Sequence, residues 1–205
     1  MTGPPVSPDV VWHESDVPRA DRWAAAGVHG ATVWLTGLPG SGKSTIAAAL
    51  TATLTRRGVL SYALDGDNLR HGLNGDLGFS AADRAENVRR VAEVARLCAD
   101  AGLVVSVPVI SPYRAGRDHA RAIHEASGLV FLEVFVDTPL AVCETRDPKG
   151  LYRRARAGEL TGLTGVDDPY EPPPAPDLVL QTADGTPADA AGTVLDALAA
   201  RGVVA

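Results

Sequence analysis

The chain has 205 residues, 45% of them hydrophobic, which is enough for one domain with a buried core and excludes a largely disordered protein. Its 19 basic and 25 acidic side chains give a net charge of −6, which makes nucleic acid an unfavourable partner. No apolar run is long enough to cross a membrane or resembles a signal peptide, so we expect a cytoplasmic protein without a membrane partner. Cys98 and Cys143 lack metal-ligand spacing, and we expect both to be buried thiols.

The first 30 residues contain several prolines and no sustained periodicity, which predicts an irregular leader with a short helix at 21–26. We expect a single domain over 31–205. It begins with an apolar strand at 31–36, followed by a Gly-rich turn and a helix from Ser44 to about Arg57, which Gly58 ends. A second strand at 59–64 completes a βαβ unit.

A long helix is predicted to begin after Ser80, a good N-cap with Asp83 three residues later, and to end at Gly102. Its apolar stripe consists of Val88, Val91, Ala92, Ala95, Cys98 and Ala99. A strand at 103–110, a helix at 114–127, a strand at 130–136 and a helix from about Pro139 follow. The Gly-, Thr- and Pro-rich segment 158–176 predicts a mobile lid, before a last strand at 177–180 and a helix at 186–201.

Apolar strands that alternate with helices predict an α/β fold with a parallel β-sheet flanked by helices on both faces. Right-handed crossovers place the carboxyl ends of all strands at one edge of such a sheet. Ligands bind along that edge. We therefore look for the site in the segments that follow each strand.

The turn after the first strand has the sequence GLPGSGKST, in which Gly37, Gly42, Lys43 and Ser44 match G-x-x-x-x-G-K-[ST]. Its backbone N–H groups and the start of the following helix would face phosphates, with Lys43 on the β and γ phosphates and Ser44 on Mg²⁺. A Gly-rich helix cap is the alternative, but a chance match rarely falls on a strand-to-helix turn. The pattern predicts a P-loop NTPase-type fold that binds ATP with Mg²⁺ through Gly37, Leu38, Pro39, Gly40, Ser41, Gly42, Lys43, Ser44 and Thr45.

Only two of the 19 basic residues are lysines, Lys43 and Lys149. Arginine replaces lysine where a diffuse charge is enough, but its planar fork does not replace a compact ammonium group in a tight phosphate site. Both lysines are therefore candidate catalytic residues, with chance as the alternative.

The second strand ends in DGDNLR, which places Asp65 and Asp67 at the same edge of the sheet as the Gly-rich turn. Asp65 is a candidate to hold a Mg²⁺ water or to accept a proton from an attacking hydroxyl. We expect Asp67 or Asn68 to cap a short helix there. A GTPase is disfavoured because the sequence lacks Asn-Lys-x-Asp, and a motor protein would be far longer.

Arg84 and Asn87 are three residues apart near the start of the long helix and share a face away from its apolar stripe. Together with Arg70 they predict a pocket for an anionic ligand, although ordinary solvated charge is the alternative. Phe79 lies in the preceding loop, where it would either join the core or stack on a base.

Segments from nearly the whole chain resemble adenylylsulfate kinases, which phosphorylate the ribose 3′-hydroxyl of adenosine 5′-phosphosulfate. These segments are VWHESDVPRADR, GLPGSGKST, DGDNLRHGLNGDLGFSAADRAENVRR, VISPYRAGRD, FLEVFVDTPLAVCETRDPKGLYRRARAG and TGLTGVDDPYEPP. The resemblance implies that Arg70, Arg84 and Asn87 bind the phosphosulfate substrate, that Phe79 stacks on its adenine, and that Ile110 and Ser111 line the pocket. It also places Lys149 by the transferred phosphate and Arg146 over the ATP base, suggests a homodimer, and raises an ATP sulfurylase as a partner.

The same resemblance treats Ser111 as a phosphorylated intermediate. No His, Lys or carboxylate adjoins it in the sequence, and direct in-line transfer needs only positioning and charge neutralisation. A spatial neighbour such as Asp65 could still activate it. The alternative is that Ser111 caps a turn before Pro112 and touches the substrate through its backbone.

The chain departs from the family pattern at two positions. Pro39 replaces a small polar residue in the Gly-rich turn and removes one N–H, and Leu163 replaces an aromatic lid residue that would contact the substrate base. The expected function is an adenylyl-sulfate kinase that uses ATP and Mg²⁺. The alternatives are a non-catalytic nucleotide-sensing module of a sulfurylase system and a kinase for another small alcohol.

Overall fold

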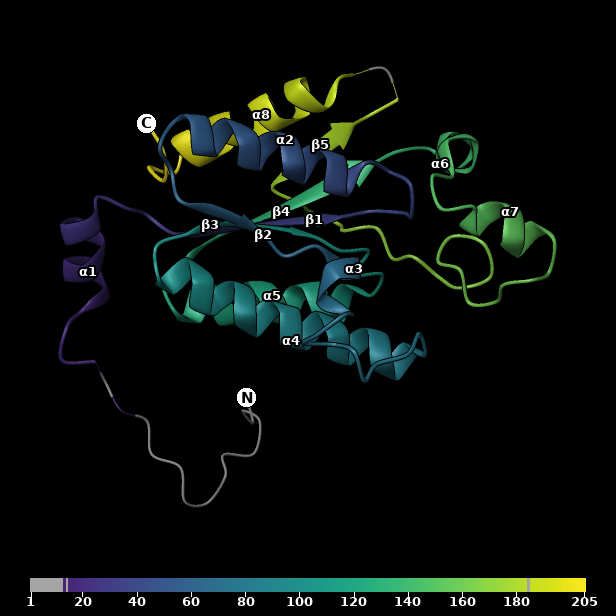
Figure 1. Cartoon of the computed structure of the whole chain (residues 1–205), viewed down its shortest axis with the longest axis horizontal. Coiled ribbons are helices and arrows are strands. Elements are labelled where there is room, and N and C mark those ends of the chain that lie inside the picture. The colour runs from purple at the N-terminus through teal and green to yellow at the C-terminus, as the bar shows by residue number, and fades with distance from the viewer. Residues whose placement is uncertain (1–12, 14, 184) are drawn as a thin grey trace.

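The computed structural model describes residues 13, 15–183 and 185–205, which form a parallel five-stranded sheet between layers of helices (Figure 1). The strands are β1 (Ala31–Thr36), β2 (Ser61–Ala63), β3 (Val104–Pro108), β4 (Val130–Asp137) and β5 (Leu178–Gln181). They lie in the order β2-β3-β1-β4-β5, and every neighbouring pair is parallel. All the strands therefore end at one edge, which confirms the α/β fold expected from the sequence.

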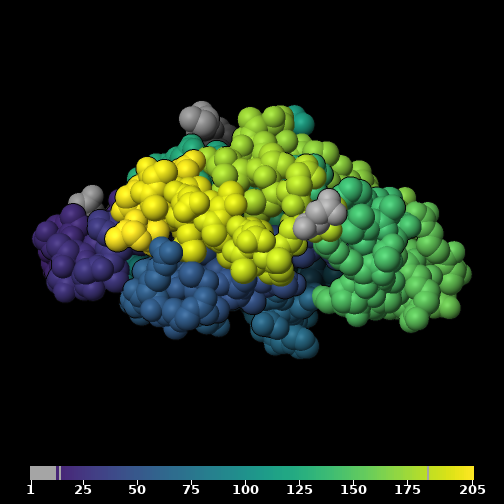
Figure 2. Space-filling model, turned by 90° about the horizontal axis from the view of Figure 1, so that it is seen from above, coloured from purple at the N-terminus to yellow at the C-terminus, as the bar shows by residue number. Residues whose placement is uncertain are grey.

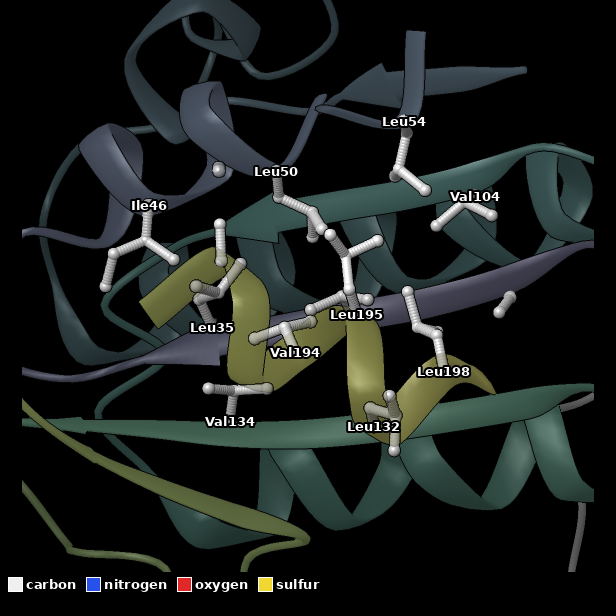
Figure 3. Close-up of a cluster of buried hydrophobic side chains, with 14 of the residues drawn as sticks. Leu35, Ile46, Leu50, Leu54, Val104, Leu132, Val134, Val194, Leu195 and Leu198 are labelled. Carbon is white, nitrogen blue, oxygen red and sulfur yellow. The ribbon is translucent and has the colours of Figure 1, made fainter. Parts of the chain in front are cut away.

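Two pairs of helices cover the sheet. Helices α2 (Lys43–Arg56) and α8 (Pro187–Ala199) lie on one face, and α4 (Ala81–Asp100) and α5 (Arg114–Ala126) lie on the other (Figure 1). Figure 3 shows Leu50 of α2 and Leu195 of α8 pointing toward one another above the sheet, in a cluster that includes Leu132 of β4. On the other face, Trp34 of β1 packs in a second cluster with Val91 of α4.

The shorter helices lie at the two ends of the sheet. Helix α1 (Arg19–Ala26) is at the end where the strands begin, and α6 (Leu140–Arg146) and α7 (Leu151–Arg156) project at the end where they finish (Figure 2). Helix α3 (Gly66–Leu69) follows β2. Helices α6 and α7 pack around a third cluster, which we call the lid cluster: Cys143, Tyr152 and Leu163 are buried in it, with Leu38, Leu140, Leu151, Ala155, Leu160 and Val166 against them.

Helix α1 confirms the short helix expected near 21–26, and it is fastened to the carboxyl end of α4. Arg19 and Arg22 form ion pairs with Asp100, and the Trp23 indole donates to the Asp100 carbonyl at 2.9 Å. Residues 1–12 and 14 of the expected irregular leader lie outside the described residues. The part of the leader that the structure describes is therefore anchored to the domain at the edge opposite to the ends of the strands.

Two expectations need correction. Cys143 is buried, but Cys98 is only half-buried because it lies with Val94 at the margin of the α4 stripe. Strand β2 is shorter than expected, since it is an edge strand and pairs only with β3. The helix expected from about Pro139 is α6, and it ends at Arg146, where Asp147 has a φ of 21° and its carboxylate accepts from N–H groups in the first turn of α7.

The segment 158–176 contains neither a helix nor a strand, only an isolated bridge between Thr164 and Asp168. Several of its hydrogen bonds are local: the Asp167 carboxylate accepts from the N–H groups of Gly162 and Leu163, and the Leu163 carbonyl accepts from those of Val166 and Asp167. The expected lid is thus a compact loop. Within the part of the chain that is described, no helix has the length and apolar character needed to span a bilayer.

Candidate active site

A cavity of about 850 Å³ opens at the carboxyl edge of the sheet. Its walls come from the segments after β1, β2 and β3, from the start of α4, from the α6–α7 connection and from the segment between β5 and α8. It is lined by the predicted site residues Pro39, Gly40, Gly42, Lys43, Ser44, Thr45, Asp65, Arg70, Arg84, Asn87, Ile110, Ser111, Arg146 and Lys149. The fold therefore brings most of the residues singled out in the sequence around one space.

The Gly-rich turn between β1 and α2 has the backbone conformation that its glycines allow. Gly37, Gly40 and Gly42 have φ values of 151°, 73° and 104°. A Cβ atom at Gly37 would lie 2.6 Å from the Val136 carbonyl oxygen, so a larger residue would displace β4 or the turn. Pro39 fits the turn, and its carbonyl accepts a hydrogen bond from the Tyr152 hydroxyl at 2.9 Å.

Lys43 is the first residue of α2, and its side chain folds back into the turn, where it is only 8% exposed. Its ammonium group donates to the carbonyl oxygens of Gly37 at 2.9 Å and Leu38 at 2.7 Å. Burial lowers the pKa of Lys43 from 10.5 to about 8, and the positive charge of Lys149 adds to this effect. The turn thus holds a buried positive charge, which strongly favours the binding of an anion at this point.

Ser44 and Asp65 come together from separate elements at the floor of the cavity. The Ser44 hydroxyl donates to Asp65 Oδ2 at 2.7 Å, while Asp65 Oδ1 accepts from the Asp67 N–H at 2.9 Å. The expectation that Asp67 or Asn68 caps the short helix is therefore wrong, because Asp65 is the N-cap of α3 and also faces Ser44. The Asp65 carboxylate can both cap α3 and face Ser44, since its two oxygens point in different directions.

Hydroxyl and carboxylate oxygens are the ligands that Mg²⁺ prefers, so the chemistry of the Ser44 and Asp65 pair fits this ion. Elsewhere in the described ranges, no group of three or more His, Cys, Asp or Glu side chains is placed to hold a metal. A magnesium ion at this pair would need further oxygen atoms from water and from a bound ligand, as is usual for this metal.

Lys149 and Arg146 lie on the opposite wall, in and beside the α6–α7 connection. The Lys149 ammonium pairs with the Asp67 carboxylate across the mouth of the cavity, and both side chains are more than half exposed. Arg146 donates to the Ser41 carbonyl at 3.3 Å and to the Thr182 carbonyl, which ties α6 to the Gly-rich turn and to the segment after β5. An exposed ion pair contributes little stability, so Lys149 can exchange Asp67 for another anion at small cost.

Arg70, Arg84 and Asn87 line the side of the cavity away from Lys43, and the last two are buried. Arg84 donates from Nε to the Phe79 carbonyl at 2.9 Å, from Nη1 to Thr164 Oγ1 at 2.7 Å, and from Nη2 to the Gly162 carbonyl. Burial and the nearby charge of Arg84 lower the pKa of Arg70, as expected where two cations share one pocket. This wall therefore favours an anion, and it also contacts the lid.

Phe79 and Leu163 are the two predicted contacts of the substrate base that do not line the cavity. Phe79 is 68% exposed, and the Arg70 guanidinium lies over its ring at 4.2 Å from the centroid. Leu163 is 7% exposed and packs in the lid cluster against Cys143 and Tyr152. Their roles at the base stay predictions, and in this conformation Leu163 serves to anchor the lid.

Ser111 follows β3 in an unusual backbone conformation, with a φ of 41°. Its hydroxyl is buried, accepts from the Trp34 indole N–H at 3.1 Å and lies 3.5 Å from the Val109 carbonyl. Within the described residues, these contacts include no carboxylate, imidazole or amine that could act as a base. The geometry matches a turn residue held in place, whereas the phosphorylated role stays a prediction.

Sequence reasoning missed two buried polar residues next to the site. Arg117 of α5 is 1% exposed and donates to the Ser111 carbonyl at 2.6 Å, and Asn74 is fully buried and donates to Asn87 Oδ1 at 3.0 Å. Both belong to segments that carry the family resemblance. The presence of a charged and a polar residue in those segments was the signal that the sequence offered, but only the fold shows what the two residues contact.

Known proteins match most of the chain. A model of the family described as Adenylylsulphate kinase matches residues 29–181. The adenylyl-sulfate kinase of Yersinia pestis is 59% identical over 173 residues, which span 84% of this chain and 80% of that protein. Adenylyl-sulfate kinase 1 of Arabidopsis thaliana chloroplasts is 54% identical over 180 residues, and this match spans 88% of this chain but only 64% of the longer relative.

A solved structure agrees with the fold. The complex of the Mycobacterium tuberculosis APS kinase CysC with AMPPNP and APS superposes with a TM-score of 0.82 at 55% identity, and the match covers 84% of this chain and 99% of that chain. That protein thus holds an ATP analogue and adenosine 5′-phosphosulfate together on the same architecture.

Proposed function

The chain belongs to the adenylylsulphate kinase family, and on this basis we propose that it transfers the γ-phosphate of ATP to the 3′-hydroxyl of adenosine 5′-phosphosulfate, giving 3′-phosphoadenylylsulfate and ADP. One observation carries the proposal. A single cavity has the Gly-rich turn with Lys43 at one wall and the cationic wall of Arg70 and the buried Arg84 at another. A nucleotide donor and an anionic acceptor can therefore face each other in it.

On the donor side, the N–H groups of the Gly-rich turn and the Lys43 ammonium would bind the phosphates of ATP. Lys43 would exchange its carbonyl partners for the β and γ phosphate oxygens and neutralise charge that develops during transfer. Ser44 and Asp65 would hold Mg²⁺, which would offset the negative charge of the phosphates. Arg146, which lines the same cavity, would cover the ATP base.

On the acceptor side, Arg70, Arg84 and Asn87 would bind the phosphosulfate group. The Asp65 oxygen that now accepts from Ser44 would take the proton of the attacking hydroxyl. Lys149 would leave Asp67 for the transferred phosphate, since its ion pair is exposed. The reaction is then a direct in-line transfer between two bound nucleotides.

Two other functions compete with this proposal. A non-catalytic nucleotide-sensing module is disfavoured because Lys43, Ser44 and Asp65 are all present at one cavity, where Ser44 contacts Asp65. A kinase for another small alcohol is disfavoured because the model of the adenylylsulphate kinase family matches residues 29–181, which include the arginines of the cavity wall. The homodimer, the sulfurylase partner and the cytoplasmic location expected from the sequence stay predictions.

The proposal is tested by a coupled assay of ADP release with adenosine 5′-phosphosulfate, AMP, gluconate and shikimate as acceptors. We expect rapid release with adenosine 5′-phosphosulfate alone and identification of the product as 3′-phosphoadenylylsulfate by mass spectrometry. Release that is faster with gluconate or shikimate would support the alcohol-kinase alternative, and nucleotide binding without any turnover would support the sensing module.

The lowered pKa of Lys43 predicts that ATP binding takes up a proton in alkaline solution. At pH 9 the free side chain, with its pKa of about 8, is mostly neutral, whereas bound phosphates raise this pKa and favour the charged form. We therefore expect an uptake of about 0.9 proton per ATP at pH 9 and much less at pH 7. Titration calorimetry in two buffers of different ionisation enthalpy measures this number directly. Equal heats in both buffers at pH 9 would show that Lys43 is already charged in the free protein.

The contacts of Ser111 predict that Ser111→Ala keeps substantial turnover. No described contact of its hydroxyl could act as a base, so direct transfer does not need the hydroxyl as a relay. The variant leaves the buried Trp34 N–H without its acceptor, which should lower the free energy of unfolding by about 1–3 kcal/mol. Steady-state kinetics and thermal unfolding of the variant measure both effects.

The matched labelling experiment uses γ-³²P ATP without an acceptor. We expect no stoichiometric label on wild-type Ser111. A phosphoserine at this position that adenosine 5′-phosphosulfate discharges, together with an inactive Ser111→Ala variant, would establish the covalent route instead.

A further inference from the structure

Arg117 of α5 is a buried cation that the proposed chemistry does not use. Its side chain is 1% exposed, and its guanidinium group reaches three separate elements. Nε donates to Glu133 Oε1 of β4 at 2.8 Å, Nη1 to the Ser111 carbonyl at 2.6 Å, and Nη2 to the Glu171 carbonyl at 2.6 Å. One planar group therefore joins the sheet, the turn after β3 and the end of the lid segment.

The turn that Arg117 contacts is strained. A φ of 41°, as at Ser111, is unfavourable for a non-glycine residue and persists only where its surroundings hold it. Three side chains donate hydrogen bonds to this turn: Trp34 to the Ser111 hydroxyl, Thr36 to the Ile110 carbonyl at 2.8 Å, and Arg117 to the Ser111 carbonyl. Since Ile110 and Ser111 line the cavity, the strain is stored in its wall.

The end of the lid segment is attached to the same turn. The Glu171 N–H donates to the Pro112 carbonyl at 2.9 Å, and the Glu171 carboxylate accepts from the Arg114 N–H at 2.7 Å. The Tyr170 hydroxyl lies 2.9 Å from Thr36 Oγ1, and its ring is 5.8 Å from the Arg117 guanidinium carbon. Arg117 is thus at the centre of the junction between the turn and the lid.

Stability alone does not explain this arrangement. A buried ion pair such as Arg117 with Glu133 is often no more stabilising than two well-packed apolar side chains of similar volume. What an apolar pair cannot provide is the pair of N–H groups that Arg117 directs at two backbone carbonyls. Lysine would keep the charge, but its single ammonium group cannot reproduce the planar fork.

We infer that Arg117 is a positioning residue for the acceptor nucleotide: through the Ser111 and Glu171 carbonyls it fixes the cavity wall and the lid end against which the acceptor binds. This inference rests on the proposed function. Arg117 does not contact the proposed ATP site, because the Gly-rich turn and Lys43 belong to other elements. Its loss should therefore affect the acceptor far more than ATP.

The test is the double variant Arg117→Met with Glu133→Met, which removes the buried charges together and preserves side-chain volume. We expect the KM for adenosine 5′-phosphosulfate to rise about tenfold or more and kcat to fall, because small misplacements of a reacting group are costly. The KM for ATP should stay within about twofold, as no ATP contact is removed. Arg96→Met is the control, since Arg96 of α4 pairs with Glu93, is separate from the Arg117 and Glu133 pair and does not line the cavity.

Wild-type turnover decides the proposed function by itself, and the ratio of variant to wild type decides the role of Arg117. A folded double variant with unchanged acceptor kinetics would overturn the inference, as would equal losses for ATP and the acceptor, which indicate a general structural defect. If the double variant does not fold, Arg117→Lys is measured in its place. In Arg117→Lys, a similar rise in the KM for the acceptor without a change in the KM for ATP supports the positioning role. An unchanged KM for the acceptor rejects this role.

Discussion

Replacement of Lys43 by alanine should abolish turnover while the fold stays intact. The ammonium group is buried in the Gly-rich turn, where its partners among the described residues are carbonyl and hydroxyl oxygens. Removing one such preorganised donor from a transition state typically lowers kcat by about 10²–10³-fold, and a full charge on the transferring phosphate should be at the upper end of this range. The measurement is ADP release at saturating substrates, combined with thermal unfolding.

Stability should change little, because burial opposes the charged form of Lys43 and alanine is a good helix former. The matched control is Arg56→Ala, which removes an exposed cation at the other end of the same helix and should leave kcat unchanged. Turnover of Lys43→Ala within about threefold of wild type would refute the assignment of this residue.

Asp65→Asn should produce the second large loss. Asparagine is as good an N-cap as aspartate, so α3 should keep its start and the fold its stability. The variant loses the negative charge that faces Ser44, and with it the proposed metal ligand and proton acceptor. General-base contributions are typically about 10²–10⁴-fold, and we expect kcat to fall by that order.

The control for Asp65→Asn is Asp76→Asn, which neutralises an exposed carboxylate paired with Arg90 and should not affect kcat. The Mg²⁺ concentration needed for half-maximal rate is the second readout, and it should rise only in the Asp65 variant. If kcat and the Mg²⁺ dependence are both close to wild type, another group must hold the metal and take the proton.

The main elements of the fold were predictable because their signals are local. The apolar run at 31–36 and the Ser80 cap with Asp83 place β1 and α4 within a residue or two of where they lie. The end of α6 before Asp147 was not predicted, since a non-glycine residue with positive φ leaves no clear trace in the hydrophobic pattern. The burial of Cys98 was overestimated because the margin of a helical stripe cannot be distinguished from its centre by periodicity alone.

Site residues were predictable where a short sequence pattern or a spacing along one element indicates a chemical role. Lys43 and Ser44 follow from the Gly-rich pattern, and Arg84 and Asn87 follow from their spacing on a helix. Contacts between distant segments were not predictable in this way. The double role of Asp65, the place of Leu163 in the lid cluster and the fork of Arg117 all depend on segments that only the folded chain brings together.

The lid cluster also limits how this enzyme could be re-engineered. Leu38 of the phosphate-binding turn packs in that cluster, and a Cβ atom at Gly165 of the lid would lie 2.7 Å from its Cδ2. A lid taken from a relative with an aromatic residue at 163 would not fit against Cys143 and Leu38, since extra volume in a packed cluster typically costs about 1–3 kcal/mol. The unit that can be exchanged is therefore larger than the lid, because a graft has to include α6, α7 and residue 38. A chimera with its boundaries at 158 and 176 would pack the lid of one protein against the cluster residues of another.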